Sequence, residues 1–234
     1  MKTVILLPTY NESDSLPFLV PAIFSQVLGA EVWVIDDNSP DGTGALVENL
    51  TTSYPKLKLI KRVKKEGLGA AYLHGIDLVL KNNEVGQIIM MDADGSHDPS
   101  YLPAMIKSLE ENDLVIGSRY VAGGGIRHWS LLRRFLSRFA NFYARLVTGL
   151  PIHDLTAGFL VWRREALAQA VRGEMKSEHY AFLIELKFKT YYDQLKIKEW
   201  PIVFIERREG ISKMDLKVLW EGITMPVVLN FSRK

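Results

Sequence analysis

The chain of 234 residues contains no cysteine. A disulfide framework and thiolate chemistry are therefore excluded, and a reducing compartment is permitted. Long apolar runs are also lacking. The best candidate, residues 216–231, is interrupted by Lys217, Glu221 and Pro226, so we expect no transmembrane helix. The N-terminus shows no signal-peptide pattern.

Two common nucleotide-binding signatures are missing as well. No Gly-x-Gly-x-x-Gly follows the first apolar run, and no Gly-Lys-Ser/Thr loop occurs in the chain. These absences disfavour a dinucleotide-dependent redox enzyme and a P-loop NTPase. A net charge of only +2 argues against a strongly polyanionic partner, and we expect no nucleic acid ligand.

Short apolar runs alternate with helical patterns in the first half of the chain. The runs predict strands at 3–7, 30–35, 57–63, 87–91 and 113–117. The patterns between them predict one helix that ends at residue 28 and further helices at 44–53, 67–81 and 99–112. This alternation predicts an α/β fold with a mostly parallel central sheet and helices on both faces. Right-handed crossovers would then place the carboxyl ends of the strands at one edge.

Polar and charged side chains cluster where four of these strands end. The clusters are residues 8–12, Asp36 with Asp37, Asp92 with Asp94, and residues 118–120. In open α/β sheets ligands bind at this edge, so the clustering indicates a ligand crevice. Solvated turns would also be polar, which leaves that alternative open.

The segment Asp92-Ala93-Asp94-Gly95-Ser96-His97 carries the clearest chemical signal. Two carboxylates one residue apart repel each other unless a cation bridges them. Mg²⁺ is usually held by one or two carboxylates together with substrate phosphates. The pair therefore suggests a divalent cation that holds a diphosphate, and two solvated loop acids are the alternative. Asp98 and Pro99 are predicted to open the next helix.

The alternation stops at residues 123–125, three glycines that predict a flexible hinge or a mobile loop. Beyond them, apolar and aromatic residues recur at helical spacing from Leu132 to Leu146, with arginines on the other side and no acid among them. This pattern fits a helix in an anionic membrane interface, and equally a core-facing helix with a basic outer face. Arg133 and Ser137 stand four residues apart, so they could grip one phosphate.

The rest of the chain predicts a strand at 159–162, helices beginning near 164 and at 178–192, and an edge or bulged strand at 195–206 with Pro201. The basic loop 207–213 could close over a diphosphate or be a solvated turn. The last stretch is amphipathic and could contact a membrane or a partner protein.

Taken together, these segments resemble glycosyltransferase family 2, and within it the dolichyl-phosphate (polyprenyl-phosphate) mannose synthases. The motifs that carry the resemblance are Pro8-Thr9-Tyr10-Asn11-Glu12, residues 36–43, residues 67–72, residues 92–97, residues 117–120, residues 154–156, and Glu199-Trp200-Pro201-Ile202 with Arg207, Gly210, Ser212 and Lys213. The resemblance implies the nucleotide-diphospho-sugar transferase (GT-A, Rossmann-like) fold. Residues 1–120 would form the nucleotide-sugar half, and 121–234 the acceptor-binding, membrane-proximal half of the same catalytic domain.

The resemblance also implies a role for individual residues. The donor would be bound by Pro8, Tyr10, Glu12, Ile35, Asp37, Asp92, Ala93, Asp94, Arg119, Arg207 and Lys213. Of these, Asp94, Arg119, Arg207 and Lys213 would be catalytic. Arg119, Arg133 and Ser137 would hold the acceptor phosphate. Asp92, Asp94 and Ser96 would form the metal site, although Ser96 stands where some relatives have a glutamine ligand.

The implied reaction moves mannose from GDP-mannose to dolichyl or polyprenyl phosphate with inversion, using Mg²⁺ or Mn²⁺. The implied location is the cytoplasmic face of a membrane, contacted peripherally, with or without small membrane-anchoring partner subunits. The alternatives are another donor such as UDP-glucose, a soluble or polymer hydroxyl acceptor, and a non-catalytic sugar-nucleotide-binding subunit. A hydroxyl acceptor would need a general base, for which His153, Asp154 and Glu185 are the candidates. Each has a structural alternative: a turn for His153 and Asp154, an arginine ion pair for Glu185.

Overall fold

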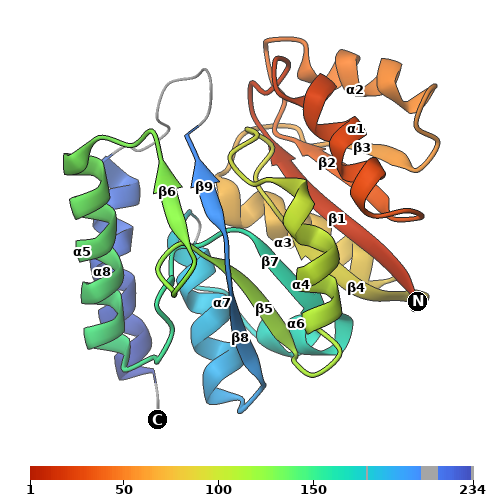
Figure 1. The fold of residues 1–234 in the computed structure, drawn as a ribbon. Helices are drawn as coiled ribbons and strands as arrows, with labels where there is room; N and C mark the ends of the chain where they lie inside the picture. Colours follow the sequence, from red (N-terminus) through yellow and green to blue (C-terminus); the bar gives the residue numbers. More distant parts are fainter. Residues whose placement is uncertain (178, 207–215, 233–234) are drawn as a thin grey trace.

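The computed structural model describes residues 1–177, 179–206 and 216–232, and its centre is a seven-stranded sheet (Figure 1). The strand order is β3-β2-β1-β4-β7-β5-β8. The strands are β1 (Lys2–Thr9), β2 (Glu31–Asp36), β3 (Leu57–Lys61), β4 (Val85–Met90), β5 (Leu114–Ser118), β7 (Leu160–Arg163) and β8 (Ile197–Pro201). The predicted α/β fold with a mostly parallel sheet is confirmed.

One strand runs against the others. β7 lies between β4 and β5 and is antiparallel to both, so β5 still runs in the same direction as β1 and β4. The carboxyl ends of β1, β2, β4 and β5 therefore meet at one edge, as predicted. The sequence indicated a strand at this position but not its place in the sheet.

Helices cover both faces of the sheet because successive residues of a strand point to opposite faces. In β1, Val4 and Leu6 join one core cluster, and Ile5 and Leu7 join the other. Burial on both faces explains the continuous apolar runs. The first cluster includes residues of α3 (Leu68–Leu80), α6 (Arg164–Ala170) and α7 (Ala181–Tyr192), and the second includes residues of α1 (Leu16–Gln26), α2 (Thr43–Thr51) and α4 (Leu102–Ser108).

Asp98 caps a short 3-10 helix, η1 (Pro99–Tyr101), by accepting the backbone N–H of Ser100 at 2.8 Å. This confirms the predicted start, although α4 ends four residues earlier than the pattern suggested. Likewise, the predicted strand 195–206 is divided after Pro201 into the edge strand β8 and a separate strand β9 (Val203–Ile205).

The glycines at 123–125 form a tight turn rather than the predicted hinge. Gly123 has φ +87°, and a Cβ on Gly124 would lie 2.6 Å from the backbone oxygen of Ser118. Gly125 then begins β6 (Gly125–Arg127), which pairs in parallel with β9. Gly123 and Gly124 are needed because the chain turns back directly onto the exit of β5.

Two helices lie side by side at the margin of the molecule, α5 (Leu131–Thr148) and α8 (Leu216–Phe231) (Figure 1). The Tyr143 hydroxyl donates to the backbone oxygen of Ile223 at 2.8 Å. Among the helices of the described segments, none combines the length and the apolar character that crossing a bilayer requires.

Candidate active site

A cleft of about 430 Å³ opens at the carboxyl edge of the sheet. It is bordered by the residues that follow β1, β2 and β4 and by the start of α3. Seven residues that the sequence analysis assigned to donor binding line it: Pro8, Tyr10, Glu12, Asp37, Asp92, Ala93 and Asp94. Side chains from three strand exits thus converge on one cavity of a size suited to a small-molecule ligand.

The structure places Ile35 elsewhere. Its side chain is fully buried, and its Cδ1 atom would lie 2.4 Å from a Cβ on Gly75 of α3. Ile35 therefore fills the space between β2 and α3 and does not line the cleft, contrary to its assigned role. Its backbone oxygen accepts the Thr9 hydroxyl at 3.3 Å, which joins the ends of β1 and β2.

One end of the cleft is organised around Asp37. Arg62 donates to its carboxylate at 2.5 Å, and both side chains are nearly buried. Burial raises the pKa of Asp37, and Arg62 opposes that rise without cancelling it. The backbone N–H of Glu66 also donates to this carboxylate, and a carboxylate held in this way can still accept N–H groups of a base or hydroxyls of a ribose.

The sequence analysis missed Lys65, which also lines this end of the cleft. Its Nζ atom lies 4.0 Å from the centre of the Tyr10 ring, within the range of a cation–π contact. Lys65 precedes Gly67, the residue before α3, whose φ of +103° turns the chain into the helix. The sequence pattern at Gly67 predicts only the start of a helix. In the structure, the residues just before Gly67 also place the Lys65 side chain at the cleft.

The acidic pair sits on a tight turn after β4. The Nδ1 atom of His97 accepts the backbone N–H of Asp92 at 3.0 Å, and Asp94 accepts the backbone N–H of Ser96 at 3.0 Å. Gly95, which lies between Asp94 and Ser96, has φ +76°. His97 is itself held by stacking on Phe159, with ring centres 5.0 Å apart, and by an edge contact with Phe204. The turn is therefore fixed before any ligand binds.

Two buried hydroxyls near this turn have no hydrogen-bond partner among the described residues, those of Ser96 and Tyr72. Burial together with the charges of Asp92 and Asp94 raises the pKa of Tyr72 well above its ordinary value. A buried hydroxyl without a hydrogen-bond partner costs folding free energy, unless a bound ligand or metal ion becomes its partner. No cluster of three or more His, Asp or Glu ligands occurs within the described segments. Two carboxylates and a hydroxyl suit Mg²⁺ or Mn²⁺ when a diphosphate supplies the remaining ligands.

Arg119 follows β5 and is fully engaged by Asp154. Its backbone N–H and its side chain both donate to the Asp154 carboxylate, at 2.7 to 2.9 Å, and it also donates to Thr156. Burial works to lower the pKa of Arg119, but Asp154 outweighs it and the pKa is raised. The charge of Asp92 contributes to the same rise in the pKa of Arg119.

Arg133 and Ser137 lie one turn apart on α5, near the exit of β5. Tyr120 donates its hydroxyl to Ser137 at 2.7 Å. Arg133 forms an ion pair with Glu206 and lies 4.2 Å from the centre of the Trp129 ring. The structure thus brings both predicted acceptor residues to one side of the Arg119 and Tyr120 segment. Arg207 and Lys213 lie outside the described residues.

A single short strand touches both groups of residues. Ile205 of β9 donates its backbone N–H to the backbone oxygen of Ser96 at 3.3 Å, and Phe204 packs against His97. The next residue, Glu206, pairs with Arg133. Residues 204–206 therefore connect the acidic turn to α5.

The three candidate general bases all have structural partners. Glu199 accepts the backbone N–H groups of His153 and Asp154, at 2.9 and 3.0 Å, and contacts the His153 ring at 2.8 Å. Asp154 is saturated by Arg119. Glu185 accepts backbone N–H groups of Lys176 and Ser177 and lies 3.7 Å from Lys189. The predicted arginine partner of Glu185 is therefore wrong, because its cation is a lysine.

The apolar stripe of α5 faces outward. Phe135, Phe139 and Phe142 are each more than half exposed, whereas Asn141 and Thr148 of the same helix are buried. Asn141 explains this orientation because its amide group exchanges hydrogen bonds with the side chain and backbone of Thr156. The core-facing alternative for this helix is wrong.

Comparisons with known proteins agree with this geometry. Residues 4–170 match the family model described as glycosyl transferase family 2. The chain is 41% identical over 216 residues to the polyprenol monophosphomannose synthase of Mycolicibacterium smegmatis, covering 92% of this chain and 81% of that protein. It is 36% identical over 223 residues to the undecaprenyl-phosphate mannosyltransferase of Micrococcus luteus, covering 95% and 91%.

A solved structure shares the fold. Glucosyl-3-phosphoglycerate synthase from Mycobacterium tuberculosis, in complex with Mn²⁺, uridine diphosphate and glucosyl-3-phosphoglycerate, matches with a TM-score of 0.68 at 19% identity. The match covers 99% of this chain and 79% of that chain. The predicted GT-A fold is confirmed.

Proposed function

Because the chain belongs to glycosyl transferase family 2, we propose that it transfers mannose from GDP-mannose to the phosphate of a polyprenol, with inversion at the sugar carbon. The two relatives named above, at 36% and 41% identity over most of the chain, support the sugar and the acceptor class. The observation that carries the proposal is a cleft with an acidic pair beside a helix whose apolar side chains face outward. A soluble acceptor would give no reason for such a helix.

In the donor cleft, Asp92 and Asp94 would hold Mg²⁺ or Mn²⁺ together with the diphosphate, and Ser96 would contribute its unpaired hydroxyl. A divalent cation held there supplies electrostatic stabilisation of the departing diphosphate. Asp37 and Tyr10 would bind the nucleoside at the other end of the cleft. Arg207 and Lys213 are proposed as further cations for the diphosphate.

The proposed transfer is a single displacement at the sugar carbon that needs no general base. An oxygen of the acceptor phosphate forms the new bond to the sugar carbon as the bond from that carbon to the diphosphate oxygen breaks. The acceptor oxygen is already ionised near neutral pH, so no general base is required. The structural engagement of His153, Asp154 and Glu185 agrees with this and disfavours a hydroxyl acceptor.

The acceptor phosphate would lie between Arg133 and Ser137, with Arg119 supporting the site from below. Charge-assisted hydrogen bonds from a guanidinium to a phosphate are among the stronger polar contacts. In this arrangement Arg133 exchanges its Glu206 partner for the incoming phosphate. Arg119 stays paired with Asp154 and stabilises the acceptor phosphate only through its positive charge.

The outward side chains of α5 and α8 would place the enzyme on the membrane that carries the acceptor. On α8, which packs beside α5, Trp220 and Phe231 are also exposed. Amphipathic helices with exposed aromatics bind in the plane of the bilayer interface. This predicts peripheral association, and any anchoring partner subunit would add to it.

The test is an assay of the purified chain with Mg²⁺ or Mn²⁺, a panel of nucleotide sugars and a short-chain polyprenyl phosphate. We expect GDP release and mannosyl lipid formation only when GDP-mannose and the lipid phosphate are both present. Transfer to free sugars or polymer hydroxyls in preference to the lipid would refute the acceptor. Preference for UDP-glucose would refute the donor, and donor binding without turnover would indicate a non-catalytic subunit.

A further inference from the structure

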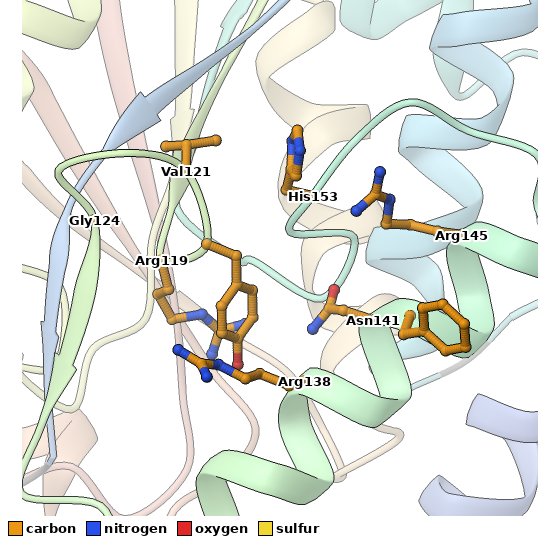
Figure 2. A pocket seen from close by; sticks show the side chains of 9 residues that line it. Arg119, Val121, Gly124, Arg138, Asn141, Arg145 and His153 are labelled. Carbon is orange, nitrogen blue, oxygen red and sulfur yellow. The ribbon is translucent and has the colours of Figure 1, made fainter.

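A second cavity, of about 320 Å³, lies between α5 and the segment that follows β5. Figure 2 shows Arg138 extending from α5 toward Arg119, and Arg145 extending toward His153. Tyr120 and Phe142 complete the wall near these groups. Among the described residues, those that line this cavity include three arginines and a histidine but no acid.

The charge of this cavity is only partly balanced. Arg119 is paired with Asp154, and His153 contacts Glu199. By contrast, the side chains of Arg138 and Arg145 form no hydrogen bond or ion pair with any residue of the described segments. Two like charges that face one cavity repel each other. An anion bound between them would remove that repulsion and accept charge-assisted hydrogen bonds.

The cavity opens next to the apolar face of α5. Phe142, which lines it, is 61% exposed, and Leu146, one turn further along, is 70% exposed. Because Arg138, Phe142 and Arg145 are separated by four and three residues, they lie on adjoining strips of the helix. A ligand with a phosphate in the cavity could therefore extend an apolar chain over Phe142 and Leu146.

We propose that this cavity binds the phosphate of an anionic phospholipid of the membrane. The proposal rests on the proposed function, which puts the apolar face of α5 on the bilayer. Residues that border such a face lie at the level of the lipid phosphates, where arginines are favoured. The site borders the acceptor position, because Arg119 lines the cavity, but it is not the same position, because Arg133 and Ser137 are not among its lining residues.

This lipid would fix how α5 lies on the membrane. Apolar burial alone leaves a helix free to rotate about its axis, whereas a phosphate held by Arg138 and Arg145 sets one flank at the headgroup level. In that orientation the exit of β5, with Arg119 and Tyr120, also faces the headgroups. The acceptor phosphate would then meet the site without leaving the interface.

The experiment compares wild type with an Arg138→Gln/Arg145→Gln double variant. The control is Lys107→Gln/Arg172→Gln, which removes the same charge from exposed positions outside α5. Binding is measured by sedimentation with vesicles of phosphatidylcholine alone and with added phosphatidylglycerol. Turnover is measured in solution with a water-soluble, short-chain prenyl phosphate and GDP-mannose.

We expect the Arg138/Arg145 variant to bind phosphatidylglycerol vesicles roughly 25-fold more weakly, at about fivefold for each arginine. The control should change by less than about threefold, and kcat/KM with the soluble acceptor should stay at the wild-type value in both. Equal weakening in the two double variants would overturn the proposal, because general surface charge would explain it. A drop in kcat/KM with the soluble acceptor would overturn it too, since the cavity would then serve the acceptor. Failure of the proposed function would appear differently, as absent turnover in wild type itself.

Discussion

The backbone of Gly158 packs against the carboxylate of Asp92: a Cβ on Gly158 would stand 3.3 Å from Asp92 Oδ1. That distance is shorter than ordinary van der Waals contact, so an added methyl group would require the carboxylate to shift by a few tenths of an ångström. Gly158 precedes β7 by two residues, and Asp92 follows β4, the neighbour of β7 in the sheet. The antiparallel strand thus brings a residue without a side chain to the acidic pair.

Gly158→Ala should therefore impair metal and donor binding while the fold is retained. We expect kcat/KM to fall by about tenfold or more, since small displacements of reacting groups are costly. The apparent affinity for Mn²⁺ should fall with it. The control is Gly222→Ala in α8, where an added Cβ meets no atom within 4 Å. Unchanged Mn²⁺ dependence in Gly158→Ala would contradict the proposed role of Asp92.

Asp94→Asn keeps the oxygen that accepts the Ser96 backbone N–H but removes the negative charge. We expect kcat/KM to fall roughly 100- to 1,000-fold, because stabilisation of the departing diphosphate is lost. Calorimetry with GDP and Mn²⁺ should show weakened binding, and the melting temperature should stay close to that of wild type. Turnover at the wild-type rate would exclude Asp94 as a metal ligand.

Arg133→Ala should act on the acceptor alone. A charged hydrogen bond is worth about 1.5–3 kcal/mol, so we expect the KM for polyprenyl phosphate to rise roughly 10- to 100-fold. The dissociation constant for GDP with Mn²⁺ should not change. Arg172→Ala, an exposed arginine outside α5, is the control. Equal loss of donor affinity in Arg133→Ala and Asp94→Asn would refute this separation of the two sites.

Lys187 predicts a pH dependence of stability. Burial lowers its pKa to about 7, although Asp154 opposes the shift, and its Nζ donates to the backbone oxygens of Leu155 and Ala157. Between pH 7 and 10.5 the unfolded chain holds this proton and the folded chain releases it. The free energy of unfolding therefore rises with pH in this window, by up to about 1.4 kcal/mol per unit.

Lys187→Met removes this dependence. We expect the difference in unfolding free energy, wild type minus variant, to increase from pH 7 to pH 9 in urea titrations. A constant difference across that range would mean that Lys187 remains charged in the folded protein.

The local elements could be predicted from sequence because they depend on periodicity and turn residues. Strand order could not, since the run at 159–162 contains nothing that specifies insertion between β4 and β5. Ile35 shows a related limit. It ends an apolar run beside two acids, and only the packing of Gly75 determines that its side chain points into the core.

The sequence pattern alone does not determine which side of α5 faces the core, for a similar reason. Its pattern has an apolar side and a polar side, and burial of the apolar side is the usual outcome. The deciding contact joins Asn141 to Thr156, 15 residues later in the chain. The pairing of Arg119 with Asp154 depends in the same way on a distant turn.

β9 has a consequence for where the two proposed sites lie relative to each other. Its Ile205 donates a backbone N–H to the backbone oxygen of Ser96, and the next residue, Glu206, is the partner of Arg133. These contacts come from consecutive residues, so a short piece of extended chain sets the spacing between the acidic turn and Arg133. The proposed metal site and the proposed acceptor residue are therefore held at a set separation before either substrate binds.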